Sequence, residues 1–235
     1  MTVEARDDLR VSVVIPMFDN ADHVAEAIES ALAQTYPVLE VLVLDDGSTD
    51  GSRDVAARYG PPVRLVAREH AGQGATRNAG AALARGEVLA FLDADDVWLP
   101  EKTARQIEVL AGDEGCAMVF GRVVQFFSPE LEQDGEPRPL GRAEERGLLP
   151  SAMVVRTQAF RRVGGFREDV TFGDFVDWYA RAQDAGLRGR VVDDVVLHRR
   201  IHATNTGIRD RSDRREYVRV LKDVLDRRAA AQPDS

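Results

Sequence analysis

Three aspartates stand almost side by side where an apolar run ends, in the stretch AFLDADDVWLP from Ala90 to Pro100. Asp93, Asp95 and Asp96 repel one another, and each raises the pKa of the others unless a cation or hydrogen-bond donors compensate the charge. The chemistry that this spacing favours is therefore the binding of a positive charge. One aspartate after a strand often caps the next turn, but capping alone explains such a cluster poorly.

A second acidic pair, Asp45 and Asp46, follows another apolar run, LEVLVL. Ligands of open parallel sheets bind outside the carboxyl ends of the strands, so both acidic groups are expected to face one cleft. A hard divalent cation such as Mn²⁺ or Mg²⁺ binds one or two carboxylates and completes its shell with water and phosphate oxygens. The two groups thus predict a cation shared with a substrate diphosphate.

The elements that must position these aspartates alternate between strand and helix over the first hundred residues. Apolar, β-branched runs predict buried strands at 11–16, 39–45, 63–67 and 87–93. Helices are expected between them, the first one capped by Asp19 or Asn20 and closed by Pro37, the second reaching about Tyr59, the third within 72–86. This alternation predicts an α/β fold with a mostly parallel central sheet covered by helices on both faces.

The regular alternation of predicted strands and helices ends after residue 101. Strands are expected at 116–127, 152–156 and 191–201, and helices around 107–110 and at 157–163, 175–186 and 211–228. The segment from Ser128 to Gly147 is charged and carries three prolines, which predicts a mobile excursion without a core, able to serve as a lid.

Composition excludes several classes of protein. The 235 residues carry a net charge of -9 with a pI near 5.0, which argues against nonspecific binding to nucleic acid or anionic lipid. The single cysteine, Cys116, allows no internal disulfide and no thiolate metal cage, and it fits a reducing, cytoplasmic location. Neither a signal peptide nor a transmembrane segment is expected from the sequence.

Four motifs in this order and at these intervals resemble the nucleotide-binding half of family 2 glycosyltransferases with the GT-A fold. They are VSVVIPMFDN, VLVLDDGSTDGS, HAGQGATRNAG and LDADDVWLP. The resemblance is continuous from about Val11 to Leu110 and patchier to about Gly207. It implies an inverting transfer of sugar from a nucleoside-diphosphate sugar, with 1–112 as the nucleotide-sugar-binding half, 113–210 as the acceptor-binding and catalytic half of the same domain, and 211–235 as a C-terminal helix and tail.

The resemblance also implies roles for individual residues. Pro16 and Phe18 would border the base, and Asp46 would contact the base or ribose. Asp95 would hold Mn²⁺ or Mg²⁺, while Arg77 and Asp93 would lie near the ribose and diphosphate. Gly72 and Gly74 would let the backbone approach the ligand, although both also suit an ordinary turn before a helix. Arg77 could equally pair with a helical neighbour on the surface.

The catalytic base is expected in TFGDFVDWYARA, Thr171 to Ala182, where the family usually shows a Glu-Asp pair ahead of an aromatic helix that ends in arginine. Here Asp174 stands where glutamate is usual and Phe175 where the catalytic aspartate is usual. Asp174 and Asp177 are the two candidates. Asp174 could instead cap the helix, and Asp177 could pair with Arg181, four residues later. We prefer Asp174, because a helix entrance is better placed to open on the cleft.

Positive charge for the departing diphosphate is expected from VLHRRIHATNTG, residues 196–207. Strand alternation would place His198, Arg200 and His202 on one face, where they could neutralise the diphosphate or, for His202, add a metal ligand. Arg199 is expected to face solvent. Trp98 and Trp178 could stack on sugar rings but are expected in the core, as is Cys116.

The sequence thus predicts a metal-dependent glycosyltransferase with a UDP-sugar as the expected donor, although no spacing separates UDP from GDP or dTDP. The acceptor is not readable from the sequence, and the terminal helix could pack on its own domain or on a second copy in a homodimer. Two alternatives stay open. A catalytically silent nucleotide-sugar-binding protein would explain Phe175, and a metal-dependent phosphohydrolase would use Asp93 as nucleophile and Asp95 as acid and base.

Overall fold

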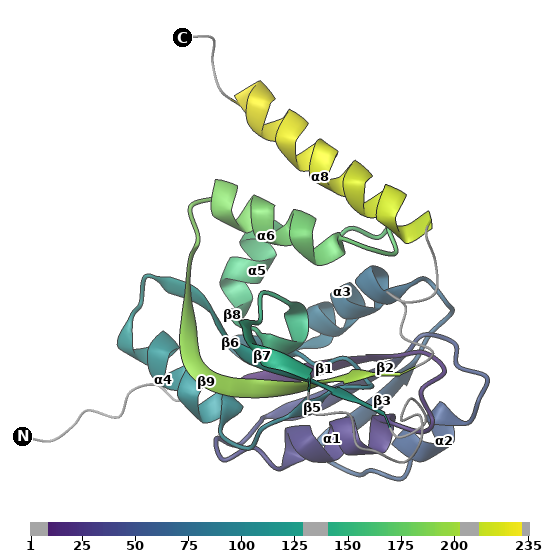
Figure 1. Cartoon of the computed structure of the whole chain (residues 1–235). Coiled ribbons are helices and arrows are strands. Elements are labelled where there is room, and N and C mark those ends of the chain that lie inside the picture. The colour runs from purple at the N-terminus through teal and green to yellow at the C-terminus, as the bar shows by residue number, and fades with distance from the viewer. Residues whose placement is uncertain (1–8, 129–140, 203–211, 232–235) are drawn as a thin grey trace, which may run out of the picture.

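The computed structural model describes residues 9–128, 141–202 and 212–231, which form one curled sheet flanked by helices (Figure 1). Strand and helix alternate in the first half: β1 (Val11–Met17), α1 (Val24–Leu32), β2 (Glu40–Asp45), α2 (Ser52–Ala56), β3 (Val63–Ala67), α3 (Gln73–Leu83) and β4 (Val88–Phe91). The second half holds β5 (Val97–Trp98), α4 (Lys102–Gly112), β6 (Cys116–Phe127), β7 (Gly141–Arg146), η2 (Pro150–Ala152), β8 (Val154–Arg156), α5 (Thr157–Val163), α6 (Asp174–Asp184), β9 (Arg188–Ile201) and α8 (Ser212–Ala231).

The strand order of the sheet is β3-β2-β1-β4-β8-β6-β9-β5, with β7 paired to β6. The first four strands are parallel, as the alternation of strand and helix predicts. Strand β8 then runs antiparallel to β4 and to β6, while the long β9 pairs in parallel with β6. Because β2 and β4 lie on opposite sides of β1, the order reverses beside β1, and a ligand crevice is expected at the carboxyl ends there.

Both faces of the sheet are buried at β1, β2 and β4, which explains why these strands read as continuous apolar runs. Val13 and Ile15 of β1 point to the face covered by α1 and α4, where they join Ile28 and Leu110 in one core cluster. Val14 points to the opposite face, covered by α3, α5 and α6. Figure 1 shows these two helical layers, with α8 lying across α6 as an outer element.

The tryptophans belong to these cores rather than to a sugar platform. Trp98 is 2% exposed and Trp178 is fully buried. Each indole N–H donates to a backbone carbonyl, Trp98 to Ser151 at 2.7 Å and Trp178 to Gly164 at 2.9 Å. Cys116 is also buried and serves as packing.

Three local expectations differ from the structure. Helix α1 begins at Val24 without a side-chain cap, because Asp19 turns away with a φ of 46° and accepts a hydrogen bond from Thr49 N. The helix ends at Leu32, well before Pro37. Part of the segment expected to be a mobile excursion is strand β7, which pairs with β6; residues 129–140 lie outside the described part of the chain.

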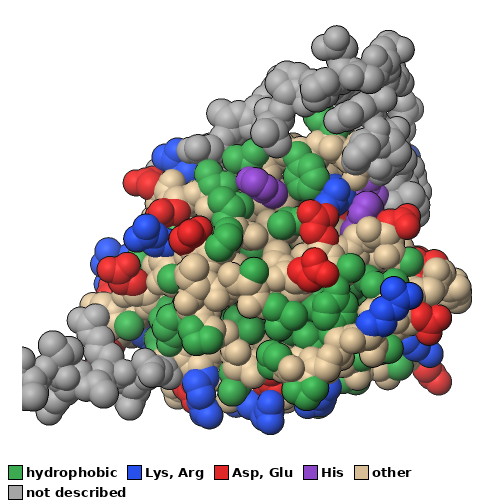
Figure 2. All heavy atoms as spheres, turned by 90° about the horizontal axis from the view of Figure 1, so that it is seen from below, with side chains coloured by type: hydrophobic (Ala, Val, Ile, Leu, Met, Phe, Trp, Pro, Cys, Tyr) green, Lys and Arg blue, Asp and Glu red, His purple; other side chains and the backbone are tan. Residues whose placement is uncertain are grey.

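Seen from below, acidic and basic side chains are interspersed on the face that carries α1 (Figure 2). That face therefore lacks the continuous basic surface typical of proteins that bind nucleic acid. Among the described residues, none of the helices is long and apolar enough to cross a membrane.

Candidate active site

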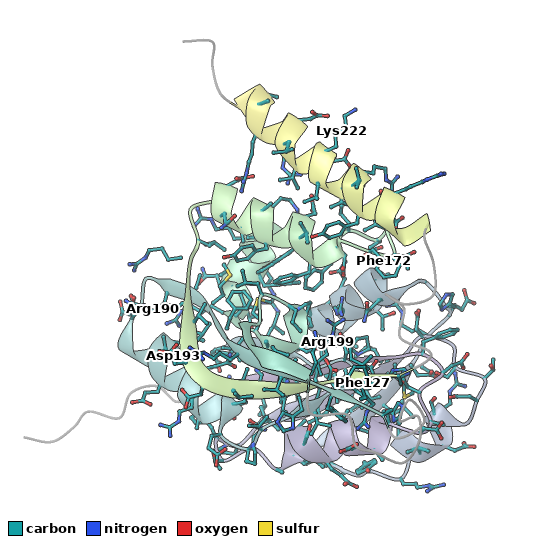
Figure 3. All side chains as sticks on the ribbon, viewed as in Figure 1. Phe127, Phe172, Arg190, Asp193, Arg199 and Lys222 are labelled. Carbon is teal, nitrogen blue, oxygen red and sulfur yellow. The ribbon has the colours of Figure 1, made fainter. Side chains whose placement is uncertain are left out.

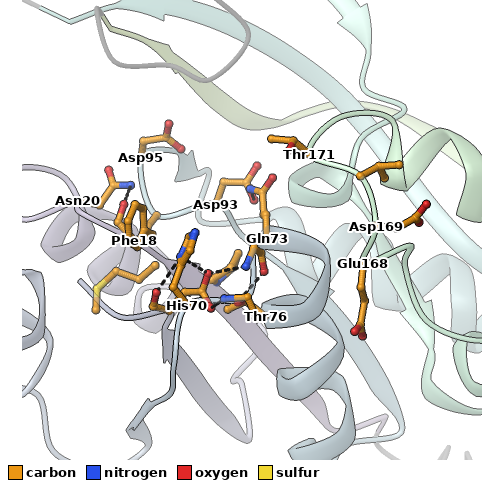
Figure 4. A pocket seen from close by; sticks show the side chains of 17 residues that line it. Phe18, Asn20, His70, Gln73, Thr76, Asp93, Asp95, Glu168, Asp169 and Thr171 are labelled. Atoms are coloured by element: carbon orange, nitrogen blue, oxygen red, sulfur yellow. Dashed lines mark hydrogen bonds and ion pairs between the residues drawn. The ribbon is translucent and has the colours of Figure 1, made fainter. Parts of the chain in front are cut away.

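A pocket of about 640 Å³ opens at the carboxyl ends of β1, β2 and β4, where the strand order reverses. Its floor and near wall come from residues around Pro16 and Phe18, from Asp46 and from the loop at His70 to Gln73. Asp93 and Asp95 lie at the end of β4, and Glu168 to Thr171 close the far side (Figure 4). The sheet topology thus gathers the motifs of the first half at one cleft.

Phe18 and His70 form an aromatic surface at one end of this pocket. The Phe18 side chain is 44% exposed although it is large and apolar, and its ring centroid lies 4.4 Å from that of His70. An exposed ring beside a second ring offers a stacking surface for a planar ligand. His70 was not singled out in the sequence, since nothing in its spacing links it to Phe18.

Asp46 shapes the same end through the backbone. Its carboxylate accepts hydrogen bonds from Ala71 N at 3.0 Å and Gly72 N at 2.9 Å, and His70 Nδ1 lies 3.0 Å from it. Gly72 has a φ of 90° and precedes the first turn of α3, a backbone conformation that favours glycine. Asp46 therefore lines the pocket and at the same time holds its loop.

The neighbouring Asp45 has a structural role, because it holds the turn after β2. It is fully buried, accepts hydrogen bonds from Arg53 Nε at 2.7 Å and Ser48 N at 2.9 Å, and does not line the pocket. Gly74 was expected to let the backbone approach a ligand. A Cβ there would instead lie 2.2 Å from the carbonyl oxygen of Arg167, so glycine is needed because another part of the backbone packs closely against it.

The three aspartates after β4 have three different partners, which is how the fold tolerates their repulsion. Asp93 accepts a hydrogen bond from Arg77 at 2.6 Å, and Asp95 lies 2.9 Å from His202 Nε2. Asp96 turns into the protein and accepts from Arg200 N at 3.0 Å. Burial, with the nearby charges of Asp95 and Asp93, holds the pKa of Asp96 well above its ordinary value.

Arg77 lies behind the pocket rather than in it. Its guanidinium is buried between Asp93 and Asp174, which it contacts at 2.6 Å and 2.9 Å, and Nε has no partner among the described residues. Burial lowers the pKa of Arg77, but the two carboxylates outweigh that effect and raise it. Arg77 therefore does not pair with a helical neighbour on the surface. It joins the residues after β4 to the start of α6.

Of the two candidates for the base, Asp174 has the freer carboxylate. Among the described residues only its Oδ2 accepts a hydrogen bond, from Arg77, and its side chain is 11% exposed. Asp177 is 2% exposed and receives both Arg181 at 2.7 Å and Arg227 at 3.0 Å. Neither carboxylate lines the pocket, and Asp174 is not the cap of α6, because the cap is Gly173.

The basic residues of β9 also lie behind the pocket. Arg200 is 6% exposed, and its guanidinium reaches Glu26 and the carbonyl of Asp95, so it does not face the space where a diphosphate would lie. His198 lies against Phe126, and burial lowers its pKa. Arg200 also lies over the Phe126 ring, at 4.5 Å. Strand alternation therefore does put His198 and Arg200 on one face, but that face packs against β6 rather than facing the pocket. Arg199 is exposed, as expected (Figure 3).

The pocket is strongly acidic. Five carboxylates line it, from Asp46, Asp93, Asp95, Glu168 and Asp169, whereas no lysine or arginine among the described residues does so. Arg167, through its hydrogen bond to Asp169, lowers the pKa of that carboxyl to about 2, so Asp169 stays ionised at neutral pH. An anionic ligand would meet repulsion here unless a cation came with it.

The residues present fit a divalent cation at Asp95. An Asp95 carboxylate oxygen and the His202 Nε2 atom lie 2.9 Å apart, and both atom types are ligands that Mn²⁺ accepts. Asp95 lines the pocket, whereas His202 is buried next to it. Within the described residues, no group of three or more histidine, cysteine or acidic side chains could hold a metal ion. A cation bound by Asp95 and His202 would therefore need oxygens from its ligand to complete its shell.

Solved structures of glycosyltransferases share this architecture. S. aureus TarS 1-349 in complex with UDP-GlcNAc superposes with a TM-score of 0.72 at 18% identity, covering 92% of this chain and 65% of that one. The mannosyltransferase PcManGT from Pyrobaculum calidifontis, in complex with GDP-Man and Mn²⁺, gives 0.65 at 20% identity, covering 96% and 76%. At these identities the likeness establishes the fold, which is the GT-A fold of glycosyltransferases.

Sequence comparison establishes the family. Residues 12–165 match the profile of glycosyl transferase family 2, and the chain belongs to that family. An uncharacterized glycosyltransferase of Rickettsia felis is 39% identical over 231 residues, 90% of this chain and 37% of that protein. A putative teichuronic acid biosynthesis glycosyltransferase of Bacillus subtilis, TuaG, is 34% identical over 114 residues, 47% of this chain and 45% of that protein.

The chain spans about a third of the length of several curated relatives. An uncharacterized glycosyltransferase of Nostoc sp., for example, is 45% identical over 105 residues, which are 43% of this chain and 33% of that protein. The fold class and the family expected from the sequence are thus confirmed.

Proposed function

We propose that this chain transfers a sugar from a nucleoside-diphosphate sugar to an acceptor hydroxyl, with inversion and with the help of a divalent cation. The observation that carries the proposal is the acidic pocket at the strand ends, which is lined by five carboxylates but by no lysine or arginine among the described residues. Such a pocket suits a ligand that brings both negative phosphates and a cation.

The nucleotide would enter at the aromatic end. The exposed face of Phe18 beside His70 suits the base, and Asp46 lies next to both with its carboxylate oriented by the loop. Pro16, at the end of β1, closes the same corner. We expect a UDP-sugar, in keeping with UDP-GlcNAc in the TarS complex, although PcManGT was solved with GDP-Man.

The cation would lie at Asp95, with His202 as the second ligand. When bound, it would neutralise the diphosphate and so stabilise it as a leaving group. Arg200 and His198 act from behind in this proposal: Arg200 fixes the backbone of Asp95 and the side chain of Asp96 rather than touching phosphate.

The base would be Asp174. Its carboxylate takes the proton of the acceptor hydroxyl; the acceptor oxygen forms a bond to the anomeric carbon from the face opposite the diphosphate, and the bond from that carbon to the phosphate oxygen breaks, its electron pair leaving with the nucleoside diphosphate. Arg77 links Asp174 to Asp93, so it holds the base close to the strand end of β4. We do not assign the role of the base to Asp177, because its carboxylate is paired with two arginines.

The two alternatives make different demands. A silent binding protein is compatible with Phe175, which is 8% exposed and packs on Trp178 and Tyr179 in the aromatic core. A phosphohydrolase would need Asp93 as a nucleophile, but Arg77 occupies one of its oxygens at 2.6 Å and the family is one of transferases. We therefore favour the transferase.

The test is a panel of UDP-, GDP- and dTDP-sugars with Mn²⁺, Mg²⁺ or EDTA, using the wild type, Asp95→Asn and Asp174→Asn. Two results together would support the transferase. Donor binding should depend on the metal and be lost in Asp95→Asn, whereas Asp174→Asn should still bind the donor but no longer release free sugar slowly. Binding without release in every condition, acceptor mixtures included, would favour the silent protein. Phosphate release from simple esters would favour the hydrolase.

A further inference from the structure

The far wall of the pocket, Glu168 to Thr171, has neither helix nor strand of its own. A segment without regular hydrogen bonds keeps one shape only if other elements satisfy its backbone groups. The contacts of this wall therefore decide how firmly it faces the ligand.

Helix α3 holds the beginning of the wall. The Asn78 side chain donates to Phe166 O at 2.9 Å and accepts from Phe166 N at 2.8 Å, and it also donates to the carboxylate of Glu168 at 2.8 Å. These contacts end at Glu168, so the part of the wall nearer to α6 needs another support.

Helix α8 supplies that support through Glu216. One oxygen, Oε2, accepts hydrogen bonds from two consecutive backbone amides, Thr171 N at 2.8 Å and Phe172 N at 3.0 Å. Arg219, one turn later, reaches Asp169 O at 3.4 Å. Hydrogen bonds between a carboxylate and backbone N–H groups are about twice as strong as neutral ones, so Glu216 is the principal clamp.

Further contacts align the same helix with the wall. Asp223 accepts a hydrogen bond from Arg167 at 2.7 Å, just before the wall. The fully buried Val220 lies 3.3 Å from where a Cβ on Gly173 would be, just after it. In Figure 3, Phe172 lies beside the first turns of α8, whereas Lys222 points outward. The inner face of α8 thus contacts the wall and the residues on both sides of it.

We infer that α8 is a positioning element of the active site and that Glu216 is its positioning residue. The inference rests on the proposed function for what the wall faces. The wall lies across Asp93 from Phe18 and His70 (Figure 4), so it borders the sugar and acceptor end of the donor rather than the base. The family match ends at residue 165, before both the wall and α8, so it assigns no part to either.

The experiment compares Glu216→Ala with Glu216→Gln and with Asp226→Ala. Glutamine keeps an oxygen that accepts both amides and serves as the conservative rescue. Asp226 is exposed on the same helix and makes no hydrogen bond or ion pair among the described residues. Asp226→Ala is therefore the matched control, because it also removes one carboxylate from α8. Affinities are measured with Mn²⁺ for UDP against UDP-glucose and UDP-GlcNAc, and for GDP against GDP-mannose.

The expected result separates the two ends of the pocket. Glu216→Ala should weaken the binding of the nucleotide-sugar by roughly five- to tenfold, as the loss of one or two hydrogen bonds implies, while the free nucleotide changes by less than about twofold. Glu216→Gln, which keeps an acceptor oxygen but not its charge, should lose clearly less affinity than Glu216→Ala, and Asp226→Ala should match the wild type. An equal loss for nucleotide and nucleotide-sugar, or no loss for either, would overturn the inference.

Amide hydrogen exchange tests the clamp without any ligand. Glu216→Ala should speed the exchange of the amides of Thr171 and Phe172 by about tenfold or more, with other segments unchanged. Unchanged exchange at these two amides would overturn the inference. Should Glu216→Ala fail to fold, Glu216→Asp, which is shorter by one methylene, gives the same readouts. If the wild type binds no nucleotide at all, the proposed function fails, whereas exchange still decides whether α8 clamps the wall.

Discussion

Arg77 and Asp174 lie 97 residues apart in the chain and form a buried ion pair of 2.9 Å. The same guanidinium contacts Asp93 at 2.6 Å, so one side chain joins the acidic end of β4 to the first residue of α6. The end of β4 and the start of α6 are thereby fixed relative to each other by charge rather than by apolar packing alone.

Replacing Arg77 should therefore be costly. Arg77→Met leaves two carboxylates near each other without their shared cation, and removing one partner of a buried pair typically costs about 3–5 kcal/mol. We expect a comparable loss in the free energy of unfolding, measured by urea denaturation, and loss of turnover. Arg199→Met, an exposed arginine on β9, is the control and should change stability by less than about 0.5 kcal/mol. Equal stability of Arg77→Met and wild type would contradict the buried link.

Phe18 should matter for binding but not for folding. Phe18→Ala removes the exposed ring beside His70, so the affinity for nucleoside diphosphates should fall by roughly fivefold or more, since an aromatic pair contributes about 0.5–1.5 kcal/mol beyond its area. Calorimetric titration with UDP and GDP measures the change. Leu32→Ala, a side chain 40% exposed on α1 and away from the pocket, should leave affinity unaltered. A similar loss in both variants would argue against a role for Phe18 in binding.

Asp177 should be a stability residue. Asp177→Asn weakens two ion pairs, with Arg181 on its own helix and with Arg227 on α8. Arg227 then keeps only a longer contact with Asp184, at 3.9 Å. We expect a loss of about 1–3 kcal/mol in the free energy of unfolding with donor affinity kept. Asp184→Asn, which breaks the more exposed pair with Arg228, should cost less than about 1 kcal/mol. Loss of turnover in Asp177→Asn at unchanged stability would instead make Asp177 the base.

Glu40 should make stability depend on pH. Burial would raise its pKa, but hydrogen bonds from Ser12 Oγ, Arg85 N and the Arg85 guanidinium outweigh that effect and lower it below the ordinary 4.5. A pKa that is lower in the folded state contributes stability that is fully present above the unfolded pKa and is lost as the pH falls through the folded one. Glu40→Gln should therefore be less stable than the wild type at pH 7 by about 1–3 kcal/mol.

That difference should shrink as the pH is lowered below 4.5, because the wild-type carboxyl then becomes protonated too. Denaturation of both proteins at several pH values between 3 and 7 measures it. A gap that stays constant over this range would show that the charge of Glu40 is not what stabilises the fold. Glu29→Gln, an exposed carboxylate on α1, is the control.

The sequence by itself determined the fold class and the family. Periodicity is local, so apolar runs such as Val11 to Pro16 and Val63 to Ala67 place strands without any knowledge of their partners. Four ordered motifs sufficed for the family because each one lies at, or shortly after, the carboxyl end of a strand. The acidic clusters could be placed at one sheet edge because parallel strands end together.

Only the tertiary structure decided which of these residues line the pocket. Asp45 and Asp46 are neighbours in the chain, yet one caps a turn and the other lines the pocket. Arg77 and Arg200 look like ligands of phosphate in the sequence, but carboxylates and carbonyls from distant elements hold them behind the pocket. Partners so far away in the chain leave no local pattern.

The far wall shows the same limit. Glu168 to Thr171 and Glu216 carry no motif, and they come together only because α8 folds back across α6. The physical reason is common to all these cases. Local spacing fixes which face of a strand or helix a side chain takes, whereas its role depends on the charges and backbone groups that the other elements bring within hydrogen-bond distance.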